Sequence, residues 1–541
     1  MGIHQFTWYG SVTMNETDDS NVQELISATD KRNIDDHHHH DENNSDASSV
    51  PIQEDDVVGS STPPSHGEIR RFMEAEKTLW NFIFMAMLFS ANHGCTVACL
   101  GLATSRFGVS IGAWQSSVLY FTYTASAILG ATYVVKALGG RDALIMGMAL
   151  YCAYVGCFWV ATINASIETP AALLGAFIGG AGGGLLWTAQ GSYFTKAAEI
   201  HAQQKPRQHV DDSTSLFAGI FAFIYLTEEV ILRSLSTALI SYGMRWSAVF
   251  GTYTAVAVTS ALGMLGIRNY HKEEDPNNNE ETSTEDRRSL IWHKATATIR
   301  LLHQDAKMKY MIGLNAVFGF ASAFLTSYVN GNVVRVALDD EESKYVGILA
   351  ALTSAVAAIC SLIFGFASQR IGKGPVLVLG AIAFGAEACL FILVPDISKH
   401  WGWGLLATVY ILHGIGRSTF EGALRAIFGD YFSYEKEGAF GNIILQNGFA
   451  TTIGYFLTFL LTCSPDTSSS NAYCVEYKDG SFHNVLLFEL IVVLSSLLAI
   501  LGYWRASVLF QKEQQQQESS SQLESDDGHT ELLENENGVV A

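Results

Sequence analysis

Four ionisable side chains recur at every fourth position of one apolar segment: His413, Arg417, Glu421 and Arg425. This spacing places them along one slowly drifting face of a helix, where opposite charges four residues apart can pair. A charge at bilayer depth costs at least about 2.5–3.5 kcal/mol. The stripe therefore predicts a face turned toward a polar cavity, unless the helix ends near Arg417 and the remainder is a cytoplasmic loop.

A second charged group, Glu228, Glu229 and Arg233, interrupts another apolar segment. Glu229 and Arg233 are four residues apart and can neutralise one another. Glu228 then needs a partner of its own or must stay protonated. This makes Glu228 a candidate proton or cation site, and the alternative is an ion pair between helices that is purely structural.

Weaker polar candidates lie in the first and fourth apolar segments. Asn92 and His93 are in the first, where a histidine is more often a satisfied packing residue than a proton relay. Trp187 and Gln190 are near the cytoplasmic end of the fourth. The indole of Trp187 could equally be an interfacial anchor.

The sequence shows no nucleophile–base pair, metal cluster or phosphate-binding loop, so we expect no catalysis, no metal and no cofactor. Two isolated acids, Glu387 and Glu489, are expected near a membrane interface. Cys463 and Cys474 flank the last short loop and predict a disulfide if that loop faces an oxidising compartment.

The elements that must position these residues are long apolar segments. The chain is 49% hydrophobic and 16% charged, whereas soluble proteins carry about 25% charged residues. A bilayer core needs about 20 apolar residues per helix, and barrel strands are far shorter. We predict an all-α polytopic membrane protein, in contact with the lipid bilayer, with twelve membrane helices at 78–102, 116–138, 142–162, 171–195, 215–240, 246–267, 308–334, 345–368, 374–394, 402–432, 437–462 and 484–504.

The polar stretches divide the chain. Residues 1–70 and 506–541 are acidic and polar, and we expect both to be disordered. Residues 75–267 and 308–505 form two six-helix halves, joined by a cytoplasmic linker at 268–307. The net charge of −21 argues against nucleic acid as a partner.

Lysine and arginine are far more frequent at one set of helix ends than at the other. Because cytoplasmic flanks retain these residues, both tails are predicted to be cytoplasmic. Asn164-Ala165-Ser166 is a glycosylation acceptor pattern in a loop that this topology places outside.

Two loops, after the second and eighth segments, share a pattern of glycine and basic residues. The pattern consists of Lys136, Gly139 and Arg141 in the first loop and of Gly365, Arg370, Gly372 and Lys373 in the second. The second loop resembles the basic signature of the major facilitator superfamily, whose plan is two facing six-helix halves. Gln369 stands where that signature has an acid. Ordinary positively charged cytoplasmic loops are the alternative.

Gly175, Gly179 and Gly183 lie on one face of the fourth segment. Without side chains there, a neighbouring helix can approach closely. The pattern favours structural packing, and a flexing gate helix is the functional alternative.

The same segment continues as Leu185-Leu186-Trp187-Thr188-Ala189-Gln190-Gly191-Ser192-Tyr193. This motif resembles the uncoordinated-93-like family, a divergent branch of the major facilitator superfamily, and residues 217–222 and 439–450 fit more loosely. The resemblance covers about residues 75–505 in layout. It implies a transporter-like fold, in a family where some members regulate potassium channels and one escorts receptors between membranes.

We therefore expect an integral multi-pass membrane protein that moves a small solute or ion by alternating access through a central polar cavity. The alternative is a non-transporting regulator or trafficking partner of an ion channel or membrane receptor, as the resemblance implies. The departure at Gln369 and the acidic tails fit this alternative.

Overall fold

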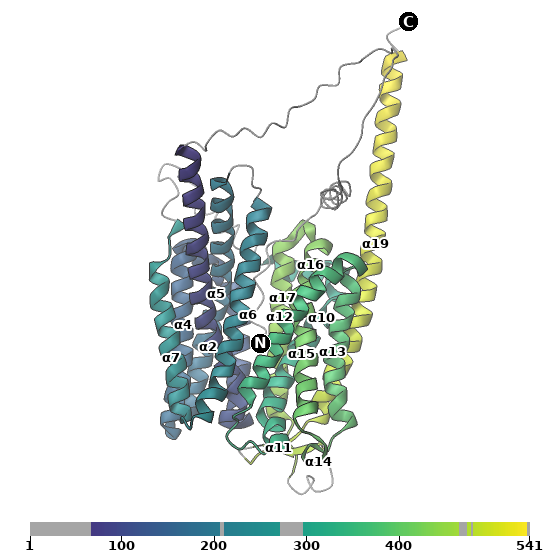
Figure 1. Ribbon diagram of the computed structural model, residues 1–541. Coiled ribbons are helices and arrows are strands. Elements are labelled where there is room, and N and C mark those ends of the chain that lie inside the picture. The colour runs from purple at the N-terminus through teal and green to yellow at the C-terminus, as the bar shows by residue number, and fades with distance from the viewer. Residues whose placement is uncertain (1–65, 206–209, 271–295, 465–472, 478–479, 538–541) are drawn as a thin grey trace, which may run out of the picture.

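The computed structural model describes residues 66–205, 210–270, 296–464, 473–477 and 480–537. The acidic segment 1–65 and most of the linker therefore lie outside the described residues. Long helices stand side by side and form two groups (Figure 1).

The first group contains the helices up to residue 266. They are α2 (His66–Leu129), α3 (Ala131–Leu138), α4 (Gly140–Ile163), the 3-10 turn η1 (Ala165–Ile167), α5 (Glu168–Gln204), α6 (Val210–Ser241), α7 (Trp246–Gly263) and the 3-10 turn η2 (Met264–Gly266). Two predicted segments are merged in α2. A non-helical residue, Gly108, with φ 78° and ψ 173°, breaks it, a conformation that glycine adopts without steric cost.

The second group follows a short helical stretch at residues 296–304. It contains α9 (Ala306–Tyr310), α10 (Ile312–Phe324), the π-helix η4 (Leu325–Val333), α11 (Val334–Leu338), α12 (Val346–Ile371), α13 (Lys373–Leu393), α14 (Ile397–His400), α15 (Trp403–Glu421), α16 (Ala423–Tyr431), η5 (Ser433–Glu435), α17 (Lys436–Leu460) and α19 (Leu486–Asn537). Strands β1 (Cys474–Glu476) and β2 (Phe482–Asn484) pair antiparallel, with Cys474 opposite Asn484.

Nine helices of the described chain are long and apolar enough to cross a membrane. This number includes α2 as a single helix, although α2 carries two of the predicted segments. The number does not include α6 and α15, the two helices that carry the clustered charges.

The two groups meet where α17 packs against α2 and α12 packs against α6. The start of α2 and the end of α19 lie at the same end of the bundle, and α11 and α14 lie at the opposite end (Figure 1). A disulfide joins Cys463 to Cys474 beside the β1–β2 hairpin.

The glycine face of α5 lies against α4. A Cβ atom on Gly175 would be 2.6 Å from Cys157 Cβ, and one on Gly179 would be 2.7 Å from Tyr154 Cγ. A Cβ on Gly183 would be 2.9 Å from the Tyr151 hydroxyl oxygen. These glycines therefore allow α4 and α5 to pack at short range.

The two basic loops have matching backbone geometry. Gly139, between α3 and α4, has φ 82° and ψ 159°, and Gly372, between α12 and α13, has φ 85° and ψ 160°. Both conformations favour glycine. The two loops that the sequence paired by composition are therefore also built alike.

Two expectations differ from the structure. The predicted span 402–432 is two helices, because Gly422 separates α15 from α16. The tail predicted to be disordered from residue 506 is helical through Asn537. Its early part is rich in glutamine and glutamate, which are good helix formers, and Glu513 forms an ion pair with the 3%-exposed Lys307 of α9.

Candidate functional site

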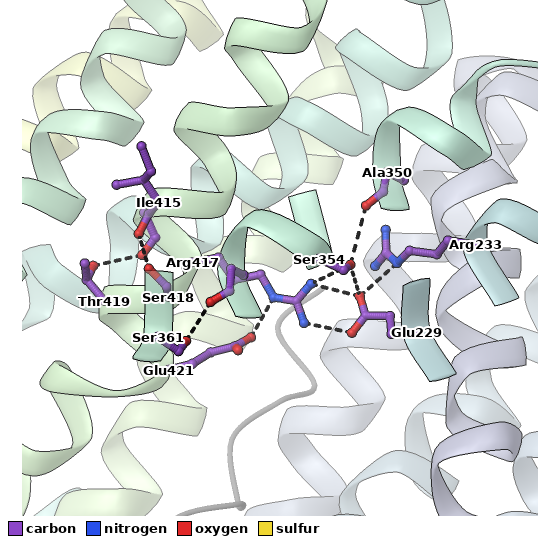
Figure 2. A network of polar contacts seen from close by, with 12 residues as sticks. Glu229, Arg233, Ala350, Ser354, Ser361, Ile415, Arg417, Ser418, Thr419 and Glu421 are labelled. Atoms are coloured by element: carbon purple, nitrogen blue, oxygen red, sulfur yellow. Dashed lines mark hydrogen bonds and ion pairs between the residues drawn. The ribbon is translucent and has the colours of Figure 1, made fainter. Parts of the chain in front are cut away.

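Arg417 is the centre of a buried ion cluster between the two helix groups. Its Nη1 donates to Glu229 Oε1 at 2.8 Å, and its Nη2 donates to Glu229 Oε2 at 2.9 Å. The side chains are 0% and 1% exposed, respectively. Arg417 lies on α15 and Glu229 on α6, so this bidentate pair joins one group to the other (Figure 2).

The guanidinium of Arg417 has two further partners from its own helix group. Its Nε donates to Glu421 Oε1 at 2.7 Å, one turn along α15. Its Nη1 also donates to Ser354 Oγ of α12 at 3.2 Å, and the Ser354 hydroxyl donates to Glu229 Oε1 at 2.8 Å. Charge-assisted bonds of this kind are stronger than neutral ones, so the site holds its charges in fixed geometry.

Glu229 is shared by two arginines. Arg233 Nε lies 2.8 Å from Glu229 Oε1, in the predicted pairing along α6. Glu228 is half-buried and makes none of the contacts of this cluster among the described residues. One carboxylate thus serves two guanidinium groups, and the cluster is neutralised by direct contact between side chains.

The predicted stripe on the tenth segment does not line one open cavity. His413 Nδ1 lies 2.9 Å from Glu387 Oε2 of α13, and both side chains are fully buried. Arg425 is buried on α16, beyond the break at Gly422. The alternative in which the helix ends near Arg417 is also wrong, because α15 continues to Glu421 and Arg417 is buried inside protein.

The two acids expected near an interface are instead enclosed by protein. Glu387 is 0% exposed and Glu489 of α19 is 1% exposed. Hydropathy predicts that a residue belongs to a membrane helix, but not which side of that helix faces a neighbour. Glu387 is the partner that the sequence could not assign to His413.

The weaker candidates in the first helix group are all buried inside that group. Asn92 Nδ2 donates to the Ala257 carbonyl of α7 at 3.0 Å. The His93 ring lies among four aromatic rings, the nearest being Trp187 with centroids 5.1 Å apart. Trp187 and Gln190 are fully buried, so Trp187 is not an interfacial anchor.

A second set of contacts joins the groups nearer the hairpin end. Asn330, on the π-helix η4, donates through Nδ2 to the Gly101 carbonyl at 3.0 Å. Its Oδ1 accepts from the Tyr410 hydroxyl at 2.5 Å. The Thr104 hydroxyl donates to the Thr326 carbonyl. These residues could not be predicted from the sequence, because single amides and hydroxyls in an apolar helix carry no periodic signal.

The remaining predicted positions lie outside the cluster. Lys373 pairs with Asp430 of α16 at 2.6 Å, and Arg141 pairs with Asp142 at 3.1 Å. Asn164 is exposed at the end of α4, where its side chain accepts from the Ser166 amide at 3.0 Å. Across the described ranges, no group of three or more histidine, cysteine or acidic side chains is placed to hold a metal ion.

Comparison with known proteins gives a family match. A protein-family model described as "Ion channel regulatory protein UNC-93" matches residues 110–466. Protein unc-93 homolog A from Bos taurus is 25% identical over 434 residues, which cover 72% of this chain and 85% of that protein. UNC93-like protein 3 from Arabidopsis thaliana is 22% identical over 357 residues, covering 64% and 74% of the two chains.

Solved transporter structures share the fold. The nucleoside transporter NupG matches with a TM-score of 0.57 at 12% identity, covering 79% of this chain and 99% of that one. A D-xylose-proton symporter matches with a TM-score of 0.55 at 13% identity, covering 81% and 97%. At such identities the likeness concerns the fold alone.

Proposed function

The chain belongs to the UNC-93 family, and from that premise we propose that it transports a small solute or ion by alternating access between its two helix groups. The observation that carries the proposal is the Glu229–Arg417 ion pair. The pair joins α6 of one helix group to α15 of the other, and both side chains are buried.

The proposal includes twelve membrane crossings with both tails in the cytoplasm. Division of α2 at Gly108 and addition of α6 and of α15 with α16 raise the nine apolar helices to twelve. The start of α2 and the end of α19 at one end of the bundle support the shared side of the tails. The two halves are residues 75–267 and 308–505, with the linker at 268–307 between them.

The free-energy cost of burying the ion pair supports a role in which the pair breaks and reforms as the two helix groups move. Each buried ion carries a desolvation penalty of several kcal/mol, and well-packed apolar residues often give equal or greater stability. A contact between halves that can break and reform suits a fold in which one bundle rocks against the other. Glu229 and Arg417 would then stabilise one of the two conformations, with Ser354 and Glu421 orienting the guanidinium.

Transport is tested with purified protein in liposomes, screened for flux of ions and small solutes. The wild type should accumulate a solute, and Arg417→Ala or Glu421→Gln should abolish that flux in protein that still folds. Lys399→Ala is the matched control, because it breaks an exposed ion pair with Asp396 on the short helix α14. Flux that persists in the Arg417 variant would rule out a role for the cluster in transport.

Regulation of an ion channel is the second candidate, favoured by the description of the matching family model. In that case the bundle acts through contacts with a channel subunit in the membrane. Cross-linking in native membranes followed by mass spectrometry separates the two functions. A channel subunit cross-linked to the described helices, together with no flux for any screened solute, would favour regulation over transport.

A further inference from the structure

Arg233 carries donor groups that the ion cluster does not use. Its side chain is 1% exposed, and its Nε lies 2.8 Å from Glu229 Oε1. Nη1 and Nη2 are buried and have no hydrogen-bond partner among the described residues. A buried charged donor without a partner is costly, so this end of the guanidinium is suited to a ligand.

The donors lie beside a cavity between the two helix groups. Arg233 lines a cavity of about 10 Å³, together with Gly101 of α2 and Gly347 and Ala350 of α12. A Cβ atom on Gly101 would be 4.0 Å from Arg233 Nη1, so this glycine leaves space in front of that nitrogen. Figure 2 shows Arg233 next to Glu229, with Ala350 and Ser354 of α12 on the facing helix.

The carboxylates of the cluster are already engaged by Arg417. Its guanidinium bonds to both oxygens of Glu229 and to Glu421 Oε1. Arg233 shares Glu229 with Arg417, and its two Nη groups remain for another partner.

We propose that Arg233 binds a monatomic monovalent anion, a halide such as chloride, in the cavity between α2, α6 and α12. A cavity of about 10 Å³ holds roughly one water-sized sphere, so a halide is the class of anion that fits with the least movement of the lining residues. A carboxylate or phosphate group is too large without movement of the helices. The anion would accept hydrogen bonds from the Nη donors, and so stabilise the conformation in which α6 contacts α12 and α15.

The site is tested by thermal unfolding of the full chain in lipid nanodiscs. Sodium chloride, bromide, acetate or gluconate is titrated at constant ionic strength. Chloride and bromide should raise the unfolding midpoint in a saturable way by about 1–3 °C, and acetate and gluconate should not. Equal midpoints in chloride and gluconate would overturn the proposal, because water alone would then satisfy Arg233.

Two variants test whether the halide-dependent rise of the unfolding midpoint arises at this cavity. Gly101→Ala puts a methyl group in front of Nη1 with all charges retained, and it should abolish the halide shift. Gly219→Ala is the matched control, because no atom lies within 4 Å of its added Cβ, and it should keep the shift. If Gly101→Ala kept the full halide-dependent rise of the midpoint, the anion would have to bind elsewhere, and the proposed site would be refuted. This test needs no flux, so its outcome is independent of the proposed transport.

Discussion

Replacement of Glu229 by glutamine is expected to destabilise the protein strongly. The substitution keeps the shape of the side chain but removes the charge that Arg417 binds at 2.8 and 2.9 Å and that Arg233 approaches at 2.8 Å. Two charge-assisted bonds at about 1.5–3 kcal/mol each give about 3–6 kcal/mol. Breaking a buried pair from one side costs about 3–5 kcal/mol. The amide oxygen can still accept one bond, so we expect about 3 kcal/mol.

The assay is thermal unfolding of purified protein in nanodiscs, where a loss of this size should lower the midpoint by roughly 3 °C. Lys399→Ala is the control, because the Lys399–Asp396 pair is 73% and 34% exposed and exposed pairs contribute about 0–1 kcal/mol. If Glu229→Gln unfolds at the same temperature as the Lys399 variant, the cluster does not hold the two helix groups together.

Three further outcomes are expected. Gly180→Ala should destabilise the bundle by about 1–3 kcal/mol, measured by unfolding midpoint, since its Cβ would be 1.9 Å from Thr122 Oγ1; no change would contradict the packing of α5 on α2. Cys474→Ser should cost about 3 kcal/mol by opening a loop of sequence separation 11, and wild-type protein that reacts with thiol reagents at this position would argue against the bridge. Lys307→Met should speed proteolysis of α19 around Glu513 because it removes their ion pair; an unchanged cleavage rate would show that this contact does not fasten the helix.

Contacts within one helix could be predicted from the sequence. The Glu229–Arg233 and Arg417–Glu421 pairs follow from four-residue spacing, and both occur. The Glu229–Arg417 pair joins residues 188 positions apart, and no local pattern specifies which face of α6 meets α15. For the same reason the sequence could not pair Glu387 with His413.

The apolar segments predicted the helical class well, because length and hydropathy are local properties. Exposure of single residues was predicted poorly. Glu387 and Glu489 were expected near a membrane interface, and an interfacial position was one of the two alternatives for Trp187, yet the structure buries all three. In a bundle of many helices, most of the shielding comes from neighbours that are distant in sequence, and a residue's position along its own helix gives little information about them.

The central claim is that the Glu229–Arg417 pair holds the two helix groups in one arrangement. The most direct test measures the distance between spin labels at positions 137 and 370, exposed sites at the ends of α3 and α12 in the two matching loops, after the six free cysteines are replaced by alanine. We predict one narrow distance distribution with Glu229 and Arg417 intact, and a shifted or broadened distribution in Arg417→Met. The same narrow distribution in a folded Arg417→Met protein would contradict the account.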